Sequence, residues 1–301
     1  MNRREFLLGS VAVAGLAKSS AFAQNTSTEK ARPLFGACRS SLKDVTIMRD
    51  LGYDFFEAGV AEFLGPEKDD AWWLTQREKI DKMPLPLLAC NGFIPRKFRL
   101  TGQSTMHDEA LDYAEKAIRR ASEAGVKAIV LGSGGARNVH GDFGTSVWPD
   151  AEKGLRDFTS FCKKLAKRID DVKNVCVVLE PLRPNESNVF NYVFQGVNIC
   201  REVNSERIMM LADIFHMLMG GDDPESILKA GSLLKHVHIA EYHTRSFPGS
   251  DPSQNEKYEV FFDMLRKIGY CGGISIEAGW EKNLDFSKKA KTAIETMKGL
   301  I

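Results

Sequence analysis

The stretch PLFGACRSS, residues 33–41, decides between two folds that a chain of alternating strands and helices can adopt. Its first part, PLFGAC, is a short apolar run typical of a strand covered on both faces. An open doubly wound sheet usually carries a glycine-rich phosphate turn directly after its first strand, whereas this chain continues as CRSS. The glycine-rich turn GSGGARN, residues 132–138, follows the fourth apolar run and does not match the GxGxxG pattern. The pattern therefore favours a closed barrel.

Apolar runs of this kind recur along the chain and alternate with amphipathic stretches. The runs occupy residues 33–38, 53–60, 85–90, 126–132, 175–180, 207–213, 235–240 and 272–278. Helical stripes of apolar residues occur between or after them, at 110–125, 155–169, 258–270 and 284–301. Long loops are expected only after Gly65 and at 245–256. Eight strand–helix units predict an α/β fold, a single-domain (β/α)8 TIM barrel over residues 24–301.

Residues 1–23 read as a targeting segment rather than as part of the barrel. They combine a short basic start, an apolar run from Phe6 to Ala17 and a small-residue site at Ala21–Ala23. The apolar run is too short for a stable membrane-spanning helix. The pair Arg3-Arg4 resembles a twin-arginine export signal, with an ordinary secretory signal as the alternative. We therefore expect an exported, periplasmic protein that has no membrane attachment after signal removal.

Composition narrows the classes of partner. The net charge is +1 and no long block of lysine and arginine occurs, which argues against nucleic acid and anionic membranes as partners. The chain has six cysteines in neither a CxxC nor a zinc-finger spacing, so buried thiols are expected rather than a disulfide framework. The oligomeric state is not readable from the sequence.

The last residues of strands five to eight carry the chemistry. In a barrel, catalytic residues come from the C-terminal ends of several strands, and these strands end with Glu180, Asp213, His238 and Glu277. Each has an ordinary alternative: an ion pair with arginine, a helix cap, a core histidine, or a solvent-facing carboxylate. Together, three carboxylates on one rim would repel one another unless a cation lay between them.

The four side chains therefore predict a site for one divalent metal ion. An oxygen-rich set with one imidazole suits Mn²⁺ best, with Mg²⁺ and Co²⁺ as alternatives, and Zn²⁺ is possible although it prefers more nitrogen or sulfur. His236 lies two residues before His238 on the same strand face, one layer deeper. We expect it to be a core histidine that orients a neighbour.

At these residues the chain resembles the xylose-isomerase-like sugar isomerase/epimerase superfamily, above all ketose 3-epimerases of the tagatose/psicose type and more loosely hydroxypyruvate isomerase. The segments that carry the resemblance are EPL at 180–182, Glu186, DIFH at 213–216, HVHIAE at 236–241, Arg245 and IEAG at 276–279. The architecture matches over most of residues 24–301, whereas the specific motifs are confined to strands five to eight.

The resemblance implies a metal-dependent isomerase or epimerase that acts on a free sugar or keto-sugar through an enediolate intermediate. Glu180 and Glu277 would be the acid/base pair as well as metal ligands. Glu186, His216 and Arg245 would hydrogen-bond the carbonyl end of the sugar. The alternative is a dehydratase or lyase acting on a keto-inositol or 3-keto-glycoside with the same metal site. A DNA-repair nuclease of the endonuclease IV type and a non-enzymatic sugar-binding protein are weaker alternatives.

Several positions depart from the family pattern or stay open. Arg245 follows His238 by seven positions, one more than is usual in ketose epimerases, so His243 could compete for its role. Arg137 in the glycine-rich turn could contact substrate, or the turn could be a mere crossing. Trp148 and Trp280 could stack on a sugar ring or fill the rim. The remaining candidates for the rim have no assigned role: Cys38, Glu57, Asn91 and Phe93.

Overall fold

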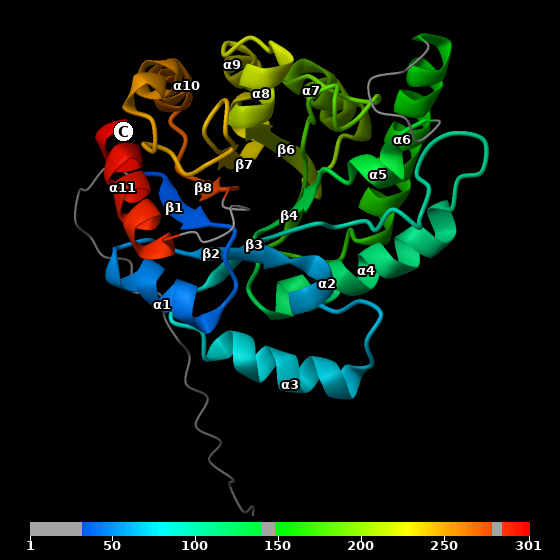
Figure 1. Cartoon of the computed structure of the whole chain (residues 1–301). Helices are drawn as coiled ribbons and strands as arrows, with labels where there is room; N and C mark the ends of the chain where they lie inside the picture. Colours follow the sequence, from blue (N-terminus) through cyan, green and yellow to red (C-terminus); the bar gives the residue numbers. More distant parts are fainter. Residues whose placement is uncertain (1–31, 140–147, 279–284) are drawn as a thin grey trace, which may run out of the picture. The chain divides into compact units, whose positions relative to one another are not determined.

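The computed structural model describes residues 32–139, 148–278 and 285–301, and the predicted signal peptide lies outside these ranges. Its strands are β1 (Leu34–Ala37), β2 (Phe56–Gly59), β3 (Leu87–Asn91), β4 (Ala128–Leu131), β5 (Cys176–Leu179), β6 (Ile208–Asp213), β7 (Leu234–Ile239) and β8 (Gly273–Ile276). All neighbouring pairs are parallel, in the order β1-β8-β7-β6-β5-β4-β3-β2 (Figure 1). Each strand falls within, or one residue beyond, a predicted apolar run. The eight-stranded barrel is thus confirmed.

The edges of the sheet, β1 and β2, meet without a continuous ladder. A single parallel bridge joins Cys38, just after β1, to Glu57, the second residue of β2. At their N-terminal ends the Asp54 carboxylate accepts a hydrogen bond from the Phe35 amide, and the Asp54 amide donates to the Phe35 carbonyl, both at 2.8 Å. We call this junction the β1–β2 seam. It leaves the barrel nearly closed.

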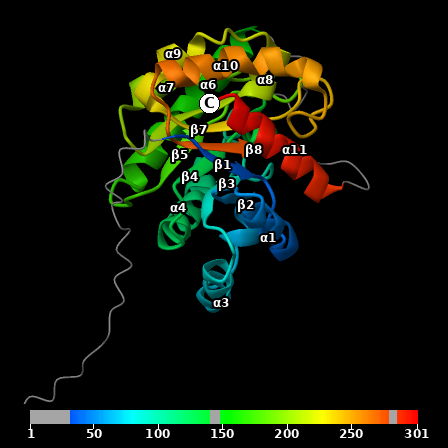
Figure 2. The same cartoon turned by 90° about the vertical axis from the view of Figure 1, so that its left-hand side faces the viewer.

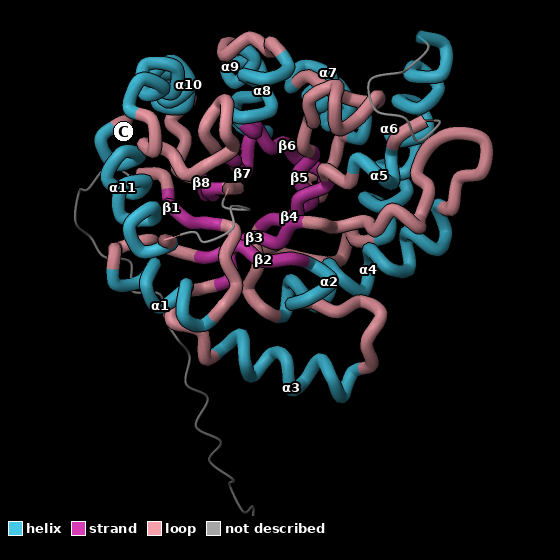
Figure 3. The backbone as a smooth tube through the Cα atoms, in the orientation of Figure 1, coloured by secondary structure: helices cyan, strands magenta, loops and turns pink. Residues whose placement is uncertain are grey.

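Helices surround the strands on the outside, as the cyan and magenta tubes of Figure 3 and the turned view of Figure 2 show. They are α1 (Leu42–Asp50), α2 (Val60–Phe63), α3 (Asp70–Asp81), α4 (His107–Glu123), α5 (Gly134–Arg137), α6 (Trp148–Arg168), α7 (Val193–Val203), α8 (Ile214–Gly220), α9 (Ser226–Ala230), α10 (Asn255–Lys267) and α11 (Phe286–Gly299). Short 3₁₀ turns occupy Gly231–Leu233 and Pro252–Gln254. Within the described ranges, no helix has both the length and the apolar character needed to cross a bilayer.

One expected loop is wrong, because the stretch after Gly65 contains α3. The helix begins at a cap in which the Asp69 carboxylate accepts a hydrogen bond from the Trp72 amide at 2.8 Å. It buries only Trp73 and Ile80, so its apolar stripe is too narrow to stand out in the sequence. The second expected loop, 245–256, is irregular until the 3₁₀ turn at Pro252 and the start of α10.

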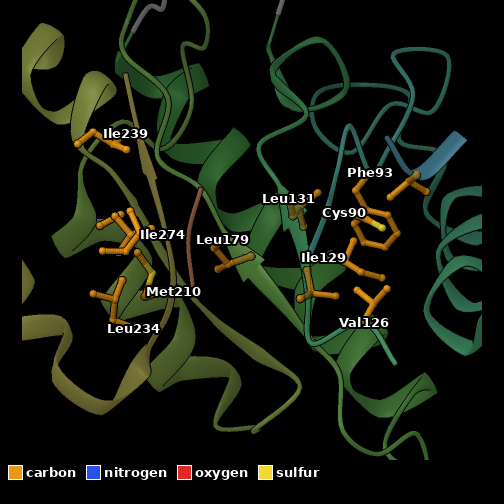
Figure 4. Close-up of a cluster of buried hydrophobic side chains, with 14 of the residues drawn as sticks. Cys90, Phe93, Val126, Ile129, Leu131, Leu179, Met210, Leu234, Ile239 and Ile274 are labelled. Atoms are coloured by element: carbon orange, nitrogen blue, oxygen red, sulfur yellow. The ribbon is translucent and has the colours of Figure 1, made fainter. Parts of the chain in front are cut away.

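The buried apolar residues form two layers. The larger layer fills the space between strands and helices, and Figure 4 shows part of it, including Ile129, Leu131 and Leu179. The smaller one lies apart from it and consists of residues from alternate positions of four neighbouring strands: Ala89, Ala128, Val130, Val178 and Leu211. Alternate positions of a strand face opposite sides, so this second layer fills the barrel interior beside β3 to β6.

The remaining part of the interior, beside β1, β2, β7 and β8, is occupied differently. Gly36 and Gly273 leave room there for the ring of Phe55, which approaches both glycines. Above that ring lie two buried histidines, His236 and His238, with Glu57 between them. The interior is therefore apolar on one side and carries charged and polar groups on the other.

All six cysteines are free thiols, as predicted. Cys90, Cys162 and Cys200 are buried and behave as small apolar residues. Cys271 is exposed, which corrects the expectation that every thiol is buried. It lies two residues before the start of β8 at Gly273.

The contact between Gly36 and Phe55 predicts a stability difference between two strand glycines. A Cβ at position 36 would lie 2.3 Å from Cε2 of Phe55, whereas a Cβ at Gly59 would meet nothing within 4 Å. We expect Gly36→Ala to lower the free energy of unfolding by about 1–3 kcal/mol because the interior is overpacked. Gly59→Ala is the matched control and should cost less than about 1 kcal/mol. Urea denaturation measures both, and equal losses would contradict this account of the interior.

Candidate active site

The four predicted metal ligands lie together at the C-terminal rim of the barrel. Asp213 ends β6 in register with His238 of β7, while Glu180 and Glu277 directly follow β5 and β8. Nδ1 of His238 is 3.2 Å from Oε1 of Glu180. It is also 3.9 Å from Oε2 of Glu277 and 4.0 Å from Oδ2 of Asp213. Three carboxylates and one imidazole nitrogen from four neighbouring strands thus surround one point.

The carboxylates of this group are held away from water. Glu180 and Asp213 are 5% and 2% exposed, and Glu277 is partly buried. Burial raises the pKa of Glu180 to about 8, although its hydrogen bond with His238 acts in the opposite direction. Burial likewise raises the pKa of Glu277. These closely spaced carboxylates fit a divalent cation as a donor set. The charge of the cation would offset both the free-energy cost of burying the carboxylates and their mutual repulsion.

A glycine and an arginine support Glu180. A Cβ at Gly132, just after β4, would lie 2.1 Å from Oε2 of Glu180, so a larger residue would displace the carboxylate. Arg137 is fully buried and donates to the carbonyls of Glu180 and Phe190 at 2.8 and 3.0 Å, and to Oγ of Ser187 at 3.1 Å. The sequence offered two alternatives for this turn, and the contacts of Arg137 do not favour the one in which it touches substrate. The guanidinium instead holds the segment that follows β5.

Asp213 performs two tasks at once. Its Oδ1 accepts a hydrogen bond from the His216 amide at 3.1 Å and thereby caps α8, as one of its ordinary alternatives suggested. Its Oδ2 faces the site and lies 4.0 Å from His238 Nδ1. The cap fixes the carboxylate plane, so the helix end orients the oxygen that remains free.

His216 is the one site residue with both ring nitrogens buried and without a hydrogen-bond partner among the described residues. Its Nε2 lies 3.5 Å from Oδ2 of Asp213 and 3.9 Å from Oε2 of Glu186. Burial lowers the pKa of His216 to about 4, so the ring is neutral at pH 7. Its ligand atom also lies within 4.8 Å of those of Glu180, Asp213 and Glu277. Unpaired buried nitrogens at this position indicate a ligand group that would satisfy them.

Arg245 closes the other side of the site. It donates to Oε1 of Glu186 at 3.1 Å and to Oε2 of Glu277 at 2.6 Å, and its guanidinium lies 4.8 Å from the ring centre of Phe215. His243 is exposed and packs against Tyr242, so the extra residue in this loop carries Arg245, and not His243, into the site. The backbone of Arg245 has φ +51°, a left-handed conformation that costs a non-glycine residue free energy.

Sequence reasoning missed the role of Glu57. This carboxylate on β2 is fully buried and lies between two imidazoles: its Oε2 is 2.9 Å from Nε2 of His236, and its Oε1 is 3.1 Å from Nε2 of His238. Burial would raise the pKa of Glu57, but the charge of His238 and the hydrogen bonds from both rings hold it well below its usual range. His236 is buried and contacts a neighbour, as expected of it. A lone glutamate in the apolar run FFEAG was the available signal.

The structure describes some, but not all, of the remaining candidates for the rim. Cys38 lies beside Glu57 and His238, and the Asn91 side-chain amide donates to the Cys38 sulfur at 3.4 Å. Phe93 is fully buried and belongs to the apolar layer. Trp280 and the side chain of Trp148 lie outside the described residues.

Comparisons with known proteins identify the family of the chain. The family described as "Xylose isomerase-like TIM barrel" matches residues 45–300. An L-ribulose 3-epimerase of Mesorhizobium japonicum is 30% identical over 164 residues, which are 53% of this chain and 54% of the relative. The chain thus aligns with about half the length of that relative. A D-psicose 3-epimerase of Agrobacterium fabrum is 27% identical over 241 residues, 75% of each protein.

The solved structure of a D-psicose 3-epimerase with D-tagatose from Clostridium cellulolyticum superposes with a TM-score of 0.71 and 17% identity, covering 90% of this chain and 99% of that one. This likeness concerns the fold. Since the family match extends over most of the chain, the protein belongs to the xylose isomerase-like TIM-barrel family.

Proposed function

We propose that the protein is a divalent-metal-dependent epimerase or isomerase of a free ketose or keto-sugar. The observation that carries the proposal is the convergence of Glu180, Asp213 and Glu277 on Nδ1 of His238, inside a barrel whose relatives include ketose 3-epimerases. No observation on the described residues favours the dehydratase or lyase alternative over this function.

The residues present fit one hard divalent cation. Glu180, Asp213, His238 and Glu277 would hold it, and three oxygen donors with one imidazole suit Mn²⁺, with Mg²⁺, Co²⁺ or Zn²⁺ as alternatives. When bound, the cation would stabilise negative charge that develops on neighbouring oxygens of the sugar. His238 is better suited than His216 to be the imidazole ligand, because its second nitrogen faces a carboxylate, as in most metal-bound histidines.

Glu180 and Glu277 would move the proton. The hydrogen on a carbon next to a carbonyl is weakly acidic, so its removal requires a base within hydrogen-bond distance and stabilisation of the enediolate that forms. Burial raises the pKa values of these two carboxyl groups, which makes each a stronger base when ionised and keeps its protonated form available closer to neutral pH. Two such groups from β5 and β8 permit removal on one face and return on the other, which inverts the carbon.

Glu186, His216 and Arg245 would bind the polar end of the sugar. The unpaired nitrogens of His216 offer one donor and one acceptor, and Arg245 offers its guanidinium beside Glu277. Because Arg245 is already paired with Glu186 and Glu277, sugar hydroxyls would have to exchange for part of these contacts. Burial keeps His216 neutral, and a neutral imidazole can still donate one hydrogen bond to a carbonyl oxygen.

Exchange with solvent deuterium tests the reaction. Incubation with Mn²⁺ and D-psicose, D-tagatose or L-ribulose in D₂O should give an epimer that carries deuterium at the inverted carbon, detected by NMR and mass spectrometry. Loss of water or of an aglycone from a keto-sugar substrate would instead support the lyase alternative. An absence of both reactions over a wide panel of keto-sugars would contradict the proposed function.

Removal of one acid/base group should separate chemistry from binding. We expect Glu277→Gln to lower kcat by about 10²–10⁴-fold, because the amide cannot take or return a proton, while the sugar still binds. Steady-state kinetics and calorimetric titration of the sugar measure the two effects. The matched control is Glu62→Gln, which changes an exposed glutamate on α2 and should leave kcat unchanged. Retention of turnover in Glu277→Gln would remove this residue from the mechanism.

Cation binding should release protons. In the metal-free protein, burial raises the pKa of Glu180 to about 8, and the pKa of His238 is raised well above its usual value because the surrounding carboxylates, Glu57 first, outweigh its burial. Both groups hold a proton at pH 7 that a cation must displace, so affinity for Mn²⁺ should increase as pH rises from about 6 to about 8. Calorimetry in buffers of different ionisation enthalpy counts the protons. Affinity that is flat or falls over this range would contradict the assignment.

A further inference from the structure

The buried carboxylate of Glu57 is the polar group that the proposed reaction leaves unused. It lies inside the barrel below the rim, and its two oxygens face Nε2 of His236 and Nε2 of His238 at 2.9 and 3.1 Å. We infer that Glu57 is a positioning residue for the cation site: it fixes the ring and tautomer of His238, and His236 fixes Glu57. This inference rests on the metal site proposed above and deepens it.

The tautomer follows from the hydrogen-bond partners. Ionised glutamate only accepts hydrogen bonds, and both oxygens of Glu57 lie within 3.3 Å of Nε2 of His238. Nε2 of a neutral His238 therefore carries the proton. Nδ1 then keeps its lone pair on the side that faces Glu180, Asp213 and Glu277. Without Glu57, the ring could place its proton on Nδ1 and lose the ability to bind a cation there.

Packing in the interior prevents Glu57 from moving away. His236 donates to Oε2 of Glu57 and stands edge-on to the rings of Phe55 and His238, with ring centres 6.1 and 5.2 Å apart. Phe55 in turn occupies the space that the missing side chains of Gly36 and Gly273 leave open. A glycine pair, an aromatic ring and an imidazole thus hold the carboxylate under His238 from below.

The same atoms also raise the alternative of a second cation site, because Cys38, Glu57 and His238 present ligand atoms within 4.8 Å of one another. The hydrogen bonds argue against it. A cation there would have to displace the proton from Nε2 of His238 and break the contact of Glu57 with His236. A single bound cation per chain is therefore expected, and the metal content of the purified protein distinguishes the two arrangements.

Two substitutions at position 57 test the inference through cation affinity rather than through turnover. Glu57→Gln keeps one acceptor oxygen and Glu57→Leu keeps none, so the Kd for Mn²⁺ should rise about 10-fold in the first and about 100-fold in the second. Competition with a fluorescent chelator measures Kd at fixed pH, and circular dichroism verifies the fold. If Glu57→Leu does not fold, the glutamine variant carries the test. Ser275→Ala is the matched control, a fully buried residue of β8 whose hydroxyl has no partner among the described residues.

A double-mutant cycle separates positioning from a general loss of packing. In a His238→Gln background, Glu57→Gln should change Kd by less than about threefold, because no imidazole remains to be oriented. Equal losses in both backgrounds, unchanged affinity in both position-57 variants, or an equal loss in Ser275→Ala would overturn the inference. Two cations per chain, one of them lost in Cys38→Ser, would overturn it in favour of the second site. A wild-type protein that binds no divalent cation would instead refute the proposed metal site itself.

Discussion

Three carboxylates share a space from which water is largely excluded, and the structure around them is organised to make this possible. Glu180, Asp213 and Glu277 approach one point from three strand ends. Burial disfavours the charge of each and proximity disfavours the charges of all three together. Without compensation such a group would protonate or move apart. Two things can compensate these charges: a cation bound between the carboxylates, and positively charged or hydrogen-bond-donating groups of the barrel around them.

The groups that surround the carboxylates each make a common type of contact. The backbone amide of His216 in α8 donates a hydrogen bond to Oδ1 of Asp213, and Arg245 donates to Oε2 of Glu277. Gly132 leaves the room that the Glu180 carboxylate occupies, and Arg137 holds the carbonyl of the same residue. Each contact restricts a carboxylate without neutralising the group as a whole. The set therefore keeps its orientation and its demand for a positive charge.

The fold and the four rim residues could be predicted because both follow from local rules. Buried parallel strands are continuous apolar runs, and the ends of successive strands of a barrel meet at one rim. The helix α3 escaped prediction because only Trp73 and Ile80 of its residues are buried. Its position depends instead on Arg120, whose guanidinium donates to four carbonyls of the preceding loop, a type of contact that any residue can supply.

Glu57 and Arg137 show where sequence reasoning ends. The partners of Glu57 on β7 lie 179 and 181 positions along the chain, so their meeting depends on closure of the barrel rather than on spacing. Arg137 contacts backbone carbonyls 43 and 53 positions away, and a carbonyl has no signature in a sequence. In both cases a charged residue in an apolar or glycine-rich segment was visible, but its partner was not.

The β1–β2 seam connects the proposed cation site with local opening of the barrel. With one register pair between its strands, the seam has little backbone hydrogen bonding to lose when the sheet opens locally. Glu57 is one of the two residues of that pair and also contacts His238, so the seam and the proposed cation site share this residue. A cation bound as proposed would favour the closed seam by mass action. Amide exchange along Phe56–Gly59 would then report on occupancy of a site at the opposite side of the barrel lumen.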